Sequence, residues 1–238
     1  MGRWSRKLAV EFAAFAGVRD GTDVLDIGSG TGALSSAVRA AAPKARIKGI
    51  DLSPAFVELA RRQHADLGIE FQTGDAQALP FAPASFDTAL TMLVINFVPD
   101  PVRAIEEMKR VTRPGGTLAA ALWDIAGEME MLRIFFDEAG ATNHHDERLT
   151  ALLQPGALVA LFRRCGLAAD EQALEVPMHF ASFDDYWSPF LLGVGPAGAH
   201  VAELTPHDRD ALVARLRARL GDGPFDLEGR AWAVKATR

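Results

Sequence analysis

Hydrophobic and polar residues follow two different spacings along the first half of the chain. Apolar runs of strand length occupy residues 24–27, 47–50 and 86–92. Stretches with helical spacing separate these runs, so strands and helices alternate along the chain. Such an alternation predicts an α/β fold built on a doubly wound parallel sheet.

Helix-start and helix-stop residues delimit the segments between the strands. Ser53 is typical of an N-cap and is followed by Pro54, and Gly68 is expected to end that helix. An apolar stripe at helical spacing predicts an amphipathic helix over residues 6–16, which ends at Gly17.

The pattern is less regular in the second half of the chain. Helices are predicted over residues 155–165 and 205–220. A strand is predicted over residues 171–176, and Trp232 and Val234 are expected on one face of a final strand.

A glycine-rich segment follows the first predicted strand. Gly28, Gly30 and Gly32 permit a tight turn and close backbone approach, and a helix is expected directly after them. A strand, glycine loop and helix in this order form a nucleotide-type site. The spacing from Gly28 to Ala33 also fits the dinucleotide fingerprint, so the glycines alone leave a nicotinamide or flavin cofactor open.

Three carboxylates stand at the ends of predicted strands. Asp26, beside the loop, would repel a pyrophosphate and attract an ammonium group such as that of S-adenosylmethionine. Asp51 suits ribose hydroxyls, which dinucleotide enzymes also bind, and Asp75 suits an adenine amine. Asp51 and Asp75 could instead begin local turns, but three acids at one sheet edge favour a binding site.

Six ordered segments resemble the class I S-adenosylmethionine-dependent methyltransferases, and within these the group that includes the ubiquinone and menaquinone methyltransferases. The segments are Val24-Leu25-Asp26-Ile27-Gly28-Ser29-Gly30-Thr31-Gly32, Gly49-Ile50-Asp51-Leu52-Ser53, Gly74-Asp75-Ala76, Leu79-Pro80-Phe81, Ser85-Phe86-Asp87 and Arg113-Pro114-Gly115-Gly116-Thr117. The resemblance implies a Rossmann-like, mostly parallel seven-stranded sheet whose last strand runs antiparallel between the fifth and sixth.

The resemblance also implies S-adenosylmethionine as cofactor and S-adenosylhomocysteine as product. The residues expected to bind the cofactor are Asp26, Gly28, Ser29, Gly30, Gly32, Asp51, Leu52, Asp75, Ala76 and Met92. We expect residues 1–238 to form a single methyltransferase domain with a cofactor-binding core at 20–124. Residues 125–150 and 178–204, together with the N-terminal helix, are expected to form a helical substrate cover.

Methyl transfer from a sulfonium is an in-line displacement, and alignment of the reactants can supply roughly 7–11 kcal/mol of barrier lowering. No catalytic residue is therefore assigned, because a strong base is not required. If a base assists, the candidates are His144, His145, His179, Asp124 and Tyr186. The adjacent histidines favour an exposed loop, His179 a partly buried structural position, and Tyr186 either core packing or acceptor contact.

Composition narrows the class of protein. The chain has 238 residues, 49% of them hydrophobic, and a net charge of −6 without a concentrated basic block, which argues against nucleic acid as the main partner. Cys165 is the only cysteine, which excludes an intrachain disulfide and a cysteine metal cluster. No stretch approaches the ~20 apolar residues of a membrane span, so we expect a cytoplasmic protein. Its oligomeric state is open.

The segment after the fourth predicted strand narrows the chemical class of the methyl acceptor. It reads Leu93-Val94-Ile95-Asn96-Phe97 and lacks the Asn/Asp-Pro-Pro-aromatic motif of enzymes that methylate adenine or glutamine. A small organic acceptor is favoured. Two alternatives stay open, namely a nicotinamide-dependent oxidoreductase that uses the same glycines and a non-catalytic S-adenosylmethionine-binding module.

Overall fold

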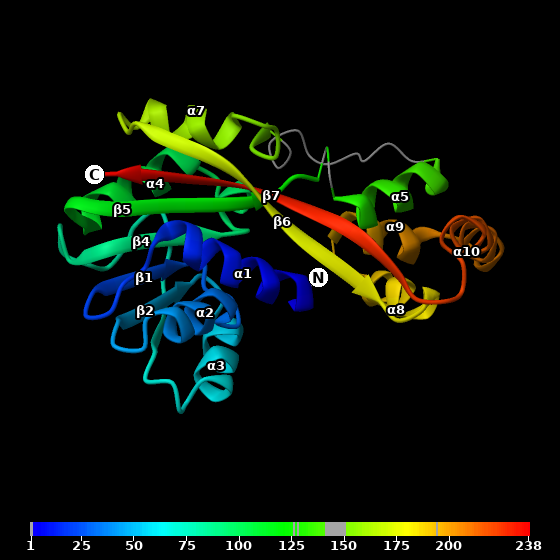
Figure 1. Cartoon of the computed structure of the whole chain (residues 1–238), viewed down its shortest axis with the longest axis horizontal. Helices are drawn as coiled ribbons and strands as arrows, with labels where there is room; N and C mark the ends of the chain where they lie inside the picture. The colour runs from blue at the N-terminus through cyan, green and yellow to red at the C-terminus, as the bar shows by residue number, and fades with distance from the viewer. Residues whose placement is uncertain (1, 126, 128, 141–150, 194) are drawn as a thin grey trace.

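The computed structural model describes all residues except 1, 126, 128, 141–150 and 194, and is organised around one seven-stranded sheet (Figure 1). The strand order is β3-β2-β1-β4-β5-β7-β6. The strands are β1 Asp23–Ile27, β2 Arg46–Asp51, β3 Glu70–Thr73, β4 Phe86–Met92, β5 Thr112–Trp123, β6 Ala169–Phe180 and β7 Phe225–Thr237. β7 pairs antiparallel with β5 and β6, while the remaining pairs are parallel. This arrangement confirms the predicted fold class.

The helices of the described residues fill the connections. They are α1 Gly2–Ala16, α2 Ala33–Ala41, α3 Pro54–Gln63, α4 Pro101–Val111, α5 Glu130–Ala139, α7 Ala157–Arg164, α8 Phe183–Trp187, α9 Gly195–Glu203 and α10 Pro206–Leu220, with 3₁₀ turns η1 Ile95–Phe97 and η2 Ser188–Leu192. Side-chain caps begin several of them as the sequence predicts. The Ser53 hydroxyl accepts a hydrogen bond from Phe56 N, and the Thr205 hydroxyl accepts one from Asp208 N.

Alternating side chains of the central strands pack into two hydrophobic layers, one on each face of the sheet. Val24 of β1 packs in the layer that contains α1 and α2, whereas Leu25 and Ile27 pack in the layer that contains α4 and α7. Helices thus cover both faces of the sheet, which explains why its central strands read as nearly continuous apolar runs. Asp26 lies on the α2 side, where Ser35 meets it.

Some element boundaries differ from those predicted. α3 ends at Gln63 and His64 leaves the helical conformation, so the helix does not continue to the residue before Gly68. β6 extends over Ala169–Phe180, well beyond the predicted residues 171–176. The extra length is explained by pairing, because β6 and β7 remain hydrogen-bonded as far as the Phe180 and Phe225 positions.

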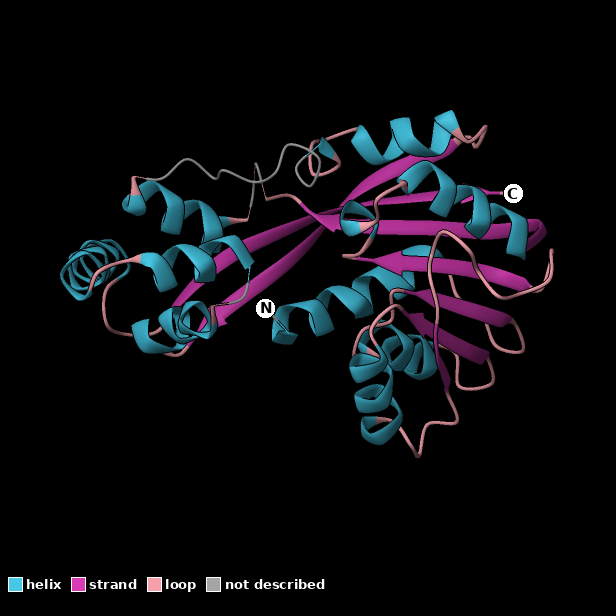
Figure 2. Cartoon of the chain, turned by 180° about the vertical axis from the view of Figure 1, so that it is seen from behind, coloured by secondary structure: helices cyan, strands magenta, loops and turns pink. Residues whose placement is uncertain are grey.

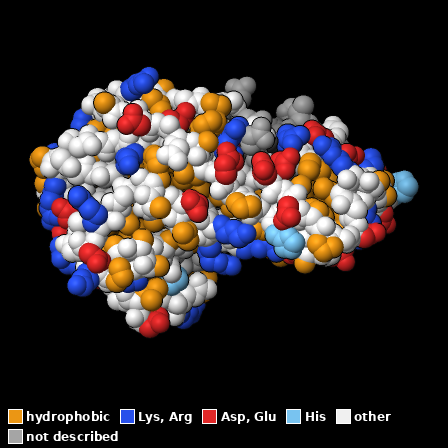
Figure 3. Space-filling model, in the orientation of Figure 1, with side chains coloured by type: hydrophobic (Ala, Val, Ile, Leu, Met, Phe, Trp, Pro, Cys, Tyr) orange, Lys and Arg blue, Asp and Glu red, His pale blue; other side chains and the backbone are white. Residues whose placement is uncertain are grey.

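The far ends of β6 and β7 project beyond the rest of the sheet and carry a separate group of helices (Figures 1 and 2). We call the group of α5, α8, η2, α9 and α10, together with these strand ends, the distal lobe. Its interior is a cluster of aromatic side chains: Phe135, Phe180, Phe183, Tyr186, Trp187 and Phe190. Figure 3 shows acidic and basic side chains interspersed over the visible face of both parts.

Helix α1 connects the distal lobe to the sheet. Its buried Trp4 packs against Phe180 with ring centroids 5.3 Å apart. Beside it, an Arg3 guanidinium nitrogen lies 2.7 Å from a carboxylate oxygen of Asp185 in α8. One face of α1 is therefore held by contacts to both parts of the molecule.

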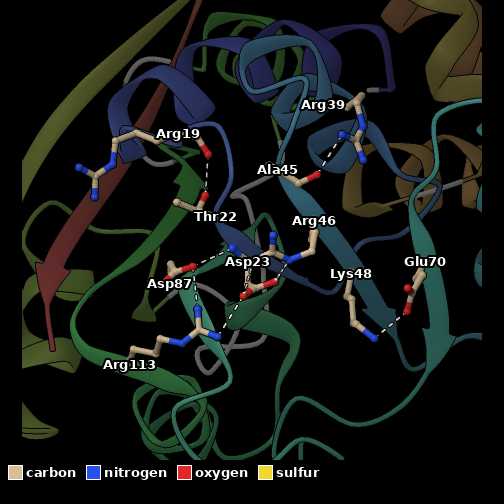
Figure 4. A network of polar contacts seen from close by, with 10 residues as sticks. All are labelled: Arg19, Thr22, Asp23, Arg39, Ala45, Arg46, Lys48, Glu70, Asp87 and Arg113. Carbon is tan, nitrogen blue, oxygen red and sulfur yellow. Dashed lines mark hydrogen bonds and ion pairs between the residues drawn. The ribbon is translucent and has the colours of Figure 1, made fainter.

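An ion-pair network joins the N-terminal ends of the central strands (Figure 4). The Asp23 carboxylate contacts Arg46 at 2.6 Å and Arg113 at 3.0 Å, and Arg113 contacts Asp87 at 2.7 Å. The hydrogen bond from Arg46 lowers the pKa of Asp23 below its usual value. The network stabilises the edge of the sheet opposite to the glycine loop.

In the described part of the chain, no helix is both long enough and apolar enough to span a membrane.

Candidate functional site

The glycine loop is held against the end of β2. Gly28 N and Ser29 N both donate hydrogen bonds to the Ile50 carbonyl oxygen, at 2.7 and 3.0 Å. Gly28 has a φ of +72°, and a Cβ atom there would lie 2.4 Å from the Val94 methyl carbons. Both the backbone conformation and the close approach of Val94 therefore require glycine.

Asp51 and Asp75 stand beside this loop at the ends of β2 and β3. The Asp51 carboxylate accepts hydrogen bonds from Gly30 N and Ser53 N, each at 2.8 Å. Asp75 accepts from Gln77 N at 2.8 Å. Both acids thus make the local turn contacts that the sequence left open, and these turns fix the carboxylates at the sheet edge.

Two cavities open at this edge. The larger has a volume of about 970 Å³ and lies between the glycine loop, α1, α2, α3 and the segment after β4. The smaller, of about 150 Å³, lies between the ends of β2 and β3 and that same segment. Four residues line both cavities: Gly28, Asp51, Val94 and Phe97. The cavities are therefore adjacent parts of one crevice, outside the carboxyl ends of the parallel strands.

The structure brings most of the expected cofactor-binding residues to this crevice. Gly28, Ser29, Gly30, Asp51 and Met92 line the larger cavity, and Gly28, Asp51, Leu52, Asp75 and Ala76 line the smaller one. Asp26 and Gly32 are not among the lining residues. That the lining residues bind a cofactor stays a prediction.

Asp26 lies beneath the glycine loop. Its side chain is almost completely buried, and its carboxylate accepts a hydrogen bond of 2.6 Å from the Ser35 hydroxyl. Burial raises the pKa of Asp26 to about 7, and the nearby charge of Asp51 acts in the same direction. Burial behind the loop therefore favours the neutral form of the Asp26 carboxyl.

Gly32 begins α2 and packs against a histidine that sequence reasoning missed. A Cβ atom at Gly32 would lie 2.6 Å from the ring of His64. The His64 Nε2 atom lies 3.0 Å from the Thr31 carbonyl oxygen. Because a carbonyl oxygen only accepts hydrogen bonds, Nε2 is the protonated ring nitrogen, and its N–H donates a hydrogen bond to the glycine loop. His64 also lines the larger cavity, and nothing in its sequence spacing pointed to this position.

The segment after β4 contains a strained residue. Leu93 has a φ of +63°, which is uncommon for a side chain with a Cβ atom, and its N–H donates to the Ala121 carbonyl at 2.8 Å. Leu93 and Val94 line the larger cavity. Strained backbone of this kind is typical of functional sites.

The described candidates for a catalytic base lie outside the crevice. Asp124 is almost completely buried, and Arg230 donates to it at 2.6 Å. Tyr186 is also buried and donates its hydroxyl proton to a backbone carbonyl, so core packing is confirmed. The expectation of a partly buried His179 is wrong, because its side chain is 61% exposed and contacts Asp226. His144 and His145 lie outside the described residues.

Of the residues expected to cover the substrate, those of the distal lobe do not form the walls of the crevice. None of the described residues of the distal lobe lines either cavity, whereas the exposed face of α1 lines the larger one. The sequence signal for α1 was present in its buried stripe of Leu8 and Phe12, because the opposite face then carries Arg6 and Val10. A covering role for residues 125–150 and 178–204 stays a prediction.

Comparisons with known proteins agree with the observed fold. The family model described as "Methyltransferase domain" matches residues 25–120. A demethylmenaquinone methyltransferase of Deinococcus radiodurans is 30% identical over 193 residues, which cover 72% of this chain and 76% of that protein. The crystal structure of YcgJ from Bacillus subtilis aligns with a TM-score of 0.62 at 19% identity, covering 99% of this chain and 98% of that one.

Other curated relatives are longer than the matched region. An uncharacterized protein of Mycobacterium tuberculosis is 35% identical over 148 residues, which cover 61% of this chain and 51% of that protein. The chain thus matches about half the length of this relative.

Proposed function

This chain belongs to the S-adenosylmethionine-dependent methyltransferases, and we propose that it transfers a methyl group from S-adenosylmethionine to a small organic acceptor. The observation that carries the proposal is the crevice in which the glycine loop, Asp51 and Asp75 meet at the ends of three neighbouring strands. Glycine backbone and two carboxylates suit a nucleoside that carries an amino acid and no phosphate.

The residues present fit this cofactor. Asp51 would bind the ribose hydroxyls, and Asp75 with Leu52 and Ala76 would surround the adenine in the smaller cavity. The Ser29 hydroxyl is buried in the wall of the larger cavity and has no hydrogen-bond partner among the described residues. An unpaired buried hydroxyl is costly unless a ligand satisfies it, which supports a polar ligand group at this point. Above its pKa of about 7, Asp26 would add a negative charge that favours the ammonium group.

The bound cofactor supplies a methyl group on a positively charged sulfur, and the chain supplies alignment. The glycine loop and Asp51 would hold the cofactor, while the segment after β4 and α1 would form walls for the acceptor. Orientation of two reactants in this way can lower the barrier by roughly 7–11 kcal/mol. His64 holds the glycine loop through Thr31, which makes it a positioning residue in this scheme.

Calorimetry with S-adenosylhomocysteine tests the cofactor site directly. We expect Asp51→Asn to weaken binding at least ten-fold, because a carboxylate that accepts hydrogen bonds is replaced by an amide. Asp66→Asn, which removes the same charge from an exposed position on the turn after α3, is the matched control and should bind normally. Equal affinities in the two variants, with both folded by circular dichroism, would contradict the proposed site.

Two further measurements decide between this function and its alternatives. Tight binding of NADH without binding of S-adenosylhomocysteine would establish the oxidoreductase instead. Transfer of a labelled methyl group to any member of a panel of small metabolites would exclude the non-catalytic module.

A cytoplasmic location belongs to the same proposal and is supported by the single, buried Cys165.

A further inference from the structure

The larger cavity extends beyond the residues proposed to bind the cofactor. Its outer part is lined by one face of α2 from Ala33 to Ala40 and by the exposed face of α1 from Gly2 to Val10. The seven helical rises from Ala33 to Ala40 correspond to about 10 Å, so the extension can hold a ring system or a medium-length chain. The small side chains of α2 leave this space open.

Apolar side chains line the larger cavity without being covered. Val10 of α1, Phe56 of α3 and Phe97 of η1 line the cavity and are 58%, 50% and 66% exposed. They come from three elements far apart in the sequence, yet they converge on one space. Exposed apolar groups that converge in this way are typical of a site for an apolar ligand.

Arg6 is the one cationic side chain with a fixed charge among the described lining residues of this cavity. Arg6 precedes Val10 by one helical turn, so the two side chains are neighbours on the face of α1 that lines the cavity. Among the described lining residues of the larger cavity, the fixed charges are those of Arg6 and Asp51. Asp51 already accepts two backbone hydrogen bonds, and no ion pair joins it to Arg6 within the described structure. The Arg6 guanidinium is available to an anion.

We infer that the methyl acceptor is an amphiphilic acid, whose anionic group binds Arg6 and whose apolar body lies along α2 against Val10, Phe56 and Phe97. The inference rests on the proposed function, since it assigns the acceptor half of the same crevice. It selects an acid over the corresponding alcohol, because guanidinium–carboxylate contacts are about twice as strong as neutral hydrogen bonds. The cofactor's own carboxylate is the other anion that could reach Arg6, and the experiment separates the two.

The test uses displacement of anilinonaphthalene sulfonate, a fluorescent amphiphilic anion, from the full chain by decanoate or by decanol. Displacement is measured with and without saturating S-adenosylhomocysteine. We expect decanoate to displace the dye from the unmodified protein at roughly ten-fold lower concentration than decanol. Arg6→Gln should abolish this preference, whereas Arg62→Gln on the exposed face of α3 should keep it.

A second pair of variants tests the apolar body. Ala40→Leu would fill the extension and should weaken displacement by both ligands about ten-fold. Ala41→Leu makes the same change one position along α2, where the residue does not line the cavity, and should have no effect. A preference for decanoate that survives in Arg6→Gln, or equal displacement in the two leucine variants, would overturn the inference.

Calorimetry with S-adenosylhomocysteine on the same variants distinguishes the possible failures. We expect its affinity to stay within about two-fold of the unmodified protein in Arg6→Gln. A large loss would assign Arg6 to the cofactor's carboxylate and overturn the acid specificity. If the unmodified protein does not bind S-adenosylhomocysteine at all, the proposed function fails, while the dye measurement without it still reports on the amphiphile site.

Discussion

At the residue scale, the glycines of the loop are required for different physical reasons. Gly28 combines a positive φ with a Val94 side chain that leaves no room for a Cβ atom. Gly30 also has a positive φ, but nothing lies within 4 Å of a Cβ atom built there. The sequence placed both glycines in the loop correctly, yet it could not rank them, because the distinction depends on a side chain 66 positions further along the chain.

Gly28→Ala should therefore be the damaging substitution. We expect it to destabilise the protein by about 1–3 kcal/mol more than a glycine-to-alanine change that only strains the backbone. It should also weaken binding of S-adenosylhomocysteine at least ten-fold, since the loop must move away from Val94. Urea denaturation and calorimetry measure the two effects.

Gly21→Ala is the matched control for this prediction. Gly21 has a similar φ of +77°, and nothing lies within 4 Å of its Cβ position. It carries the backbone strain without the steric contact. The prediction fails if the two variants lose equal stability and bind S-adenosylhomocysteine equally well.

At the scale of elements, the ends of helices and strands were predictable where a local signal sets them. Thr205 caps α10 where expected because its hydroxyl oxygen accepts from the Asp208 N–H, only three residues further along the chain. The early end of α3 had no such signal, since His64 leaves the helix to reach Thr31 on another element. The length of β6 likewise depends on its pairing with β7. Long-range contacts therefore decided what the local pattern could not.

Helix α1 provides an element-scale prediction, because one face is anchored and the other lines the larger cavity. Trp4→Ala removes the ring that packs on Phe180 and should destabilise the protein by about 3–5 kcal/mol. It should also increase amide hydrogen exchange throughout α1. Val10→Ala is the control on the exposed face, for which we expect a change within about 0.5 kcal/mol. Unchanged exchange in α1 of the Trp4 variant would show that the anchor lies elsewhere.

At the scale of the whole molecule, the crevice is assembled from parts that differ in how well they could be predicted. The glycine loop, Asp51 and Asp75 were predictable, because each follows its own strand and parallel strands end at one edge. The walls formed by η1 and α3 were not, because no local pattern reports which helix faces meet across a cavity. Phe56 and His64 belong to this second class.

The dependence of global stability on pH combines groups from the sheet and from the distal lobe. Arg46 lowers the pKa of Asp23, and Arg3 lowers that of Asp185. Such acids stabilise the fold above their unfolded-state pKa near 4, and this contribution is lost as the pH falls through the lower folded-state pKa. Asp26 acts in the opposite sense. Its folded-state pKa of about 7 exceeds its unfolded-state value, so stability falls between about pH 4 and pH 7 as the buried carboxyl must ionise.

We therefore expect the free energy of unfolding to be greatest at about pH 4 to 5 and to decline toward neutrality. Asp26→Asn keeps the shape of the side chain but cannot ionise, so it should remove that decline. From the pKa shift, the difference in unfolding free energy between variant and parent should change by up to roughly 4 kcal/mol between pH 4 and pH 8. Urea denaturation across this range measures it, with the exposed Asp66→Asn as control. Parallel pH profiles for the parent and Asp26→Asn would mean that Asp26 stays ionised in the folded protein, in which case Ser35 and the loop stabilise its charge more strongly than burial opposes it.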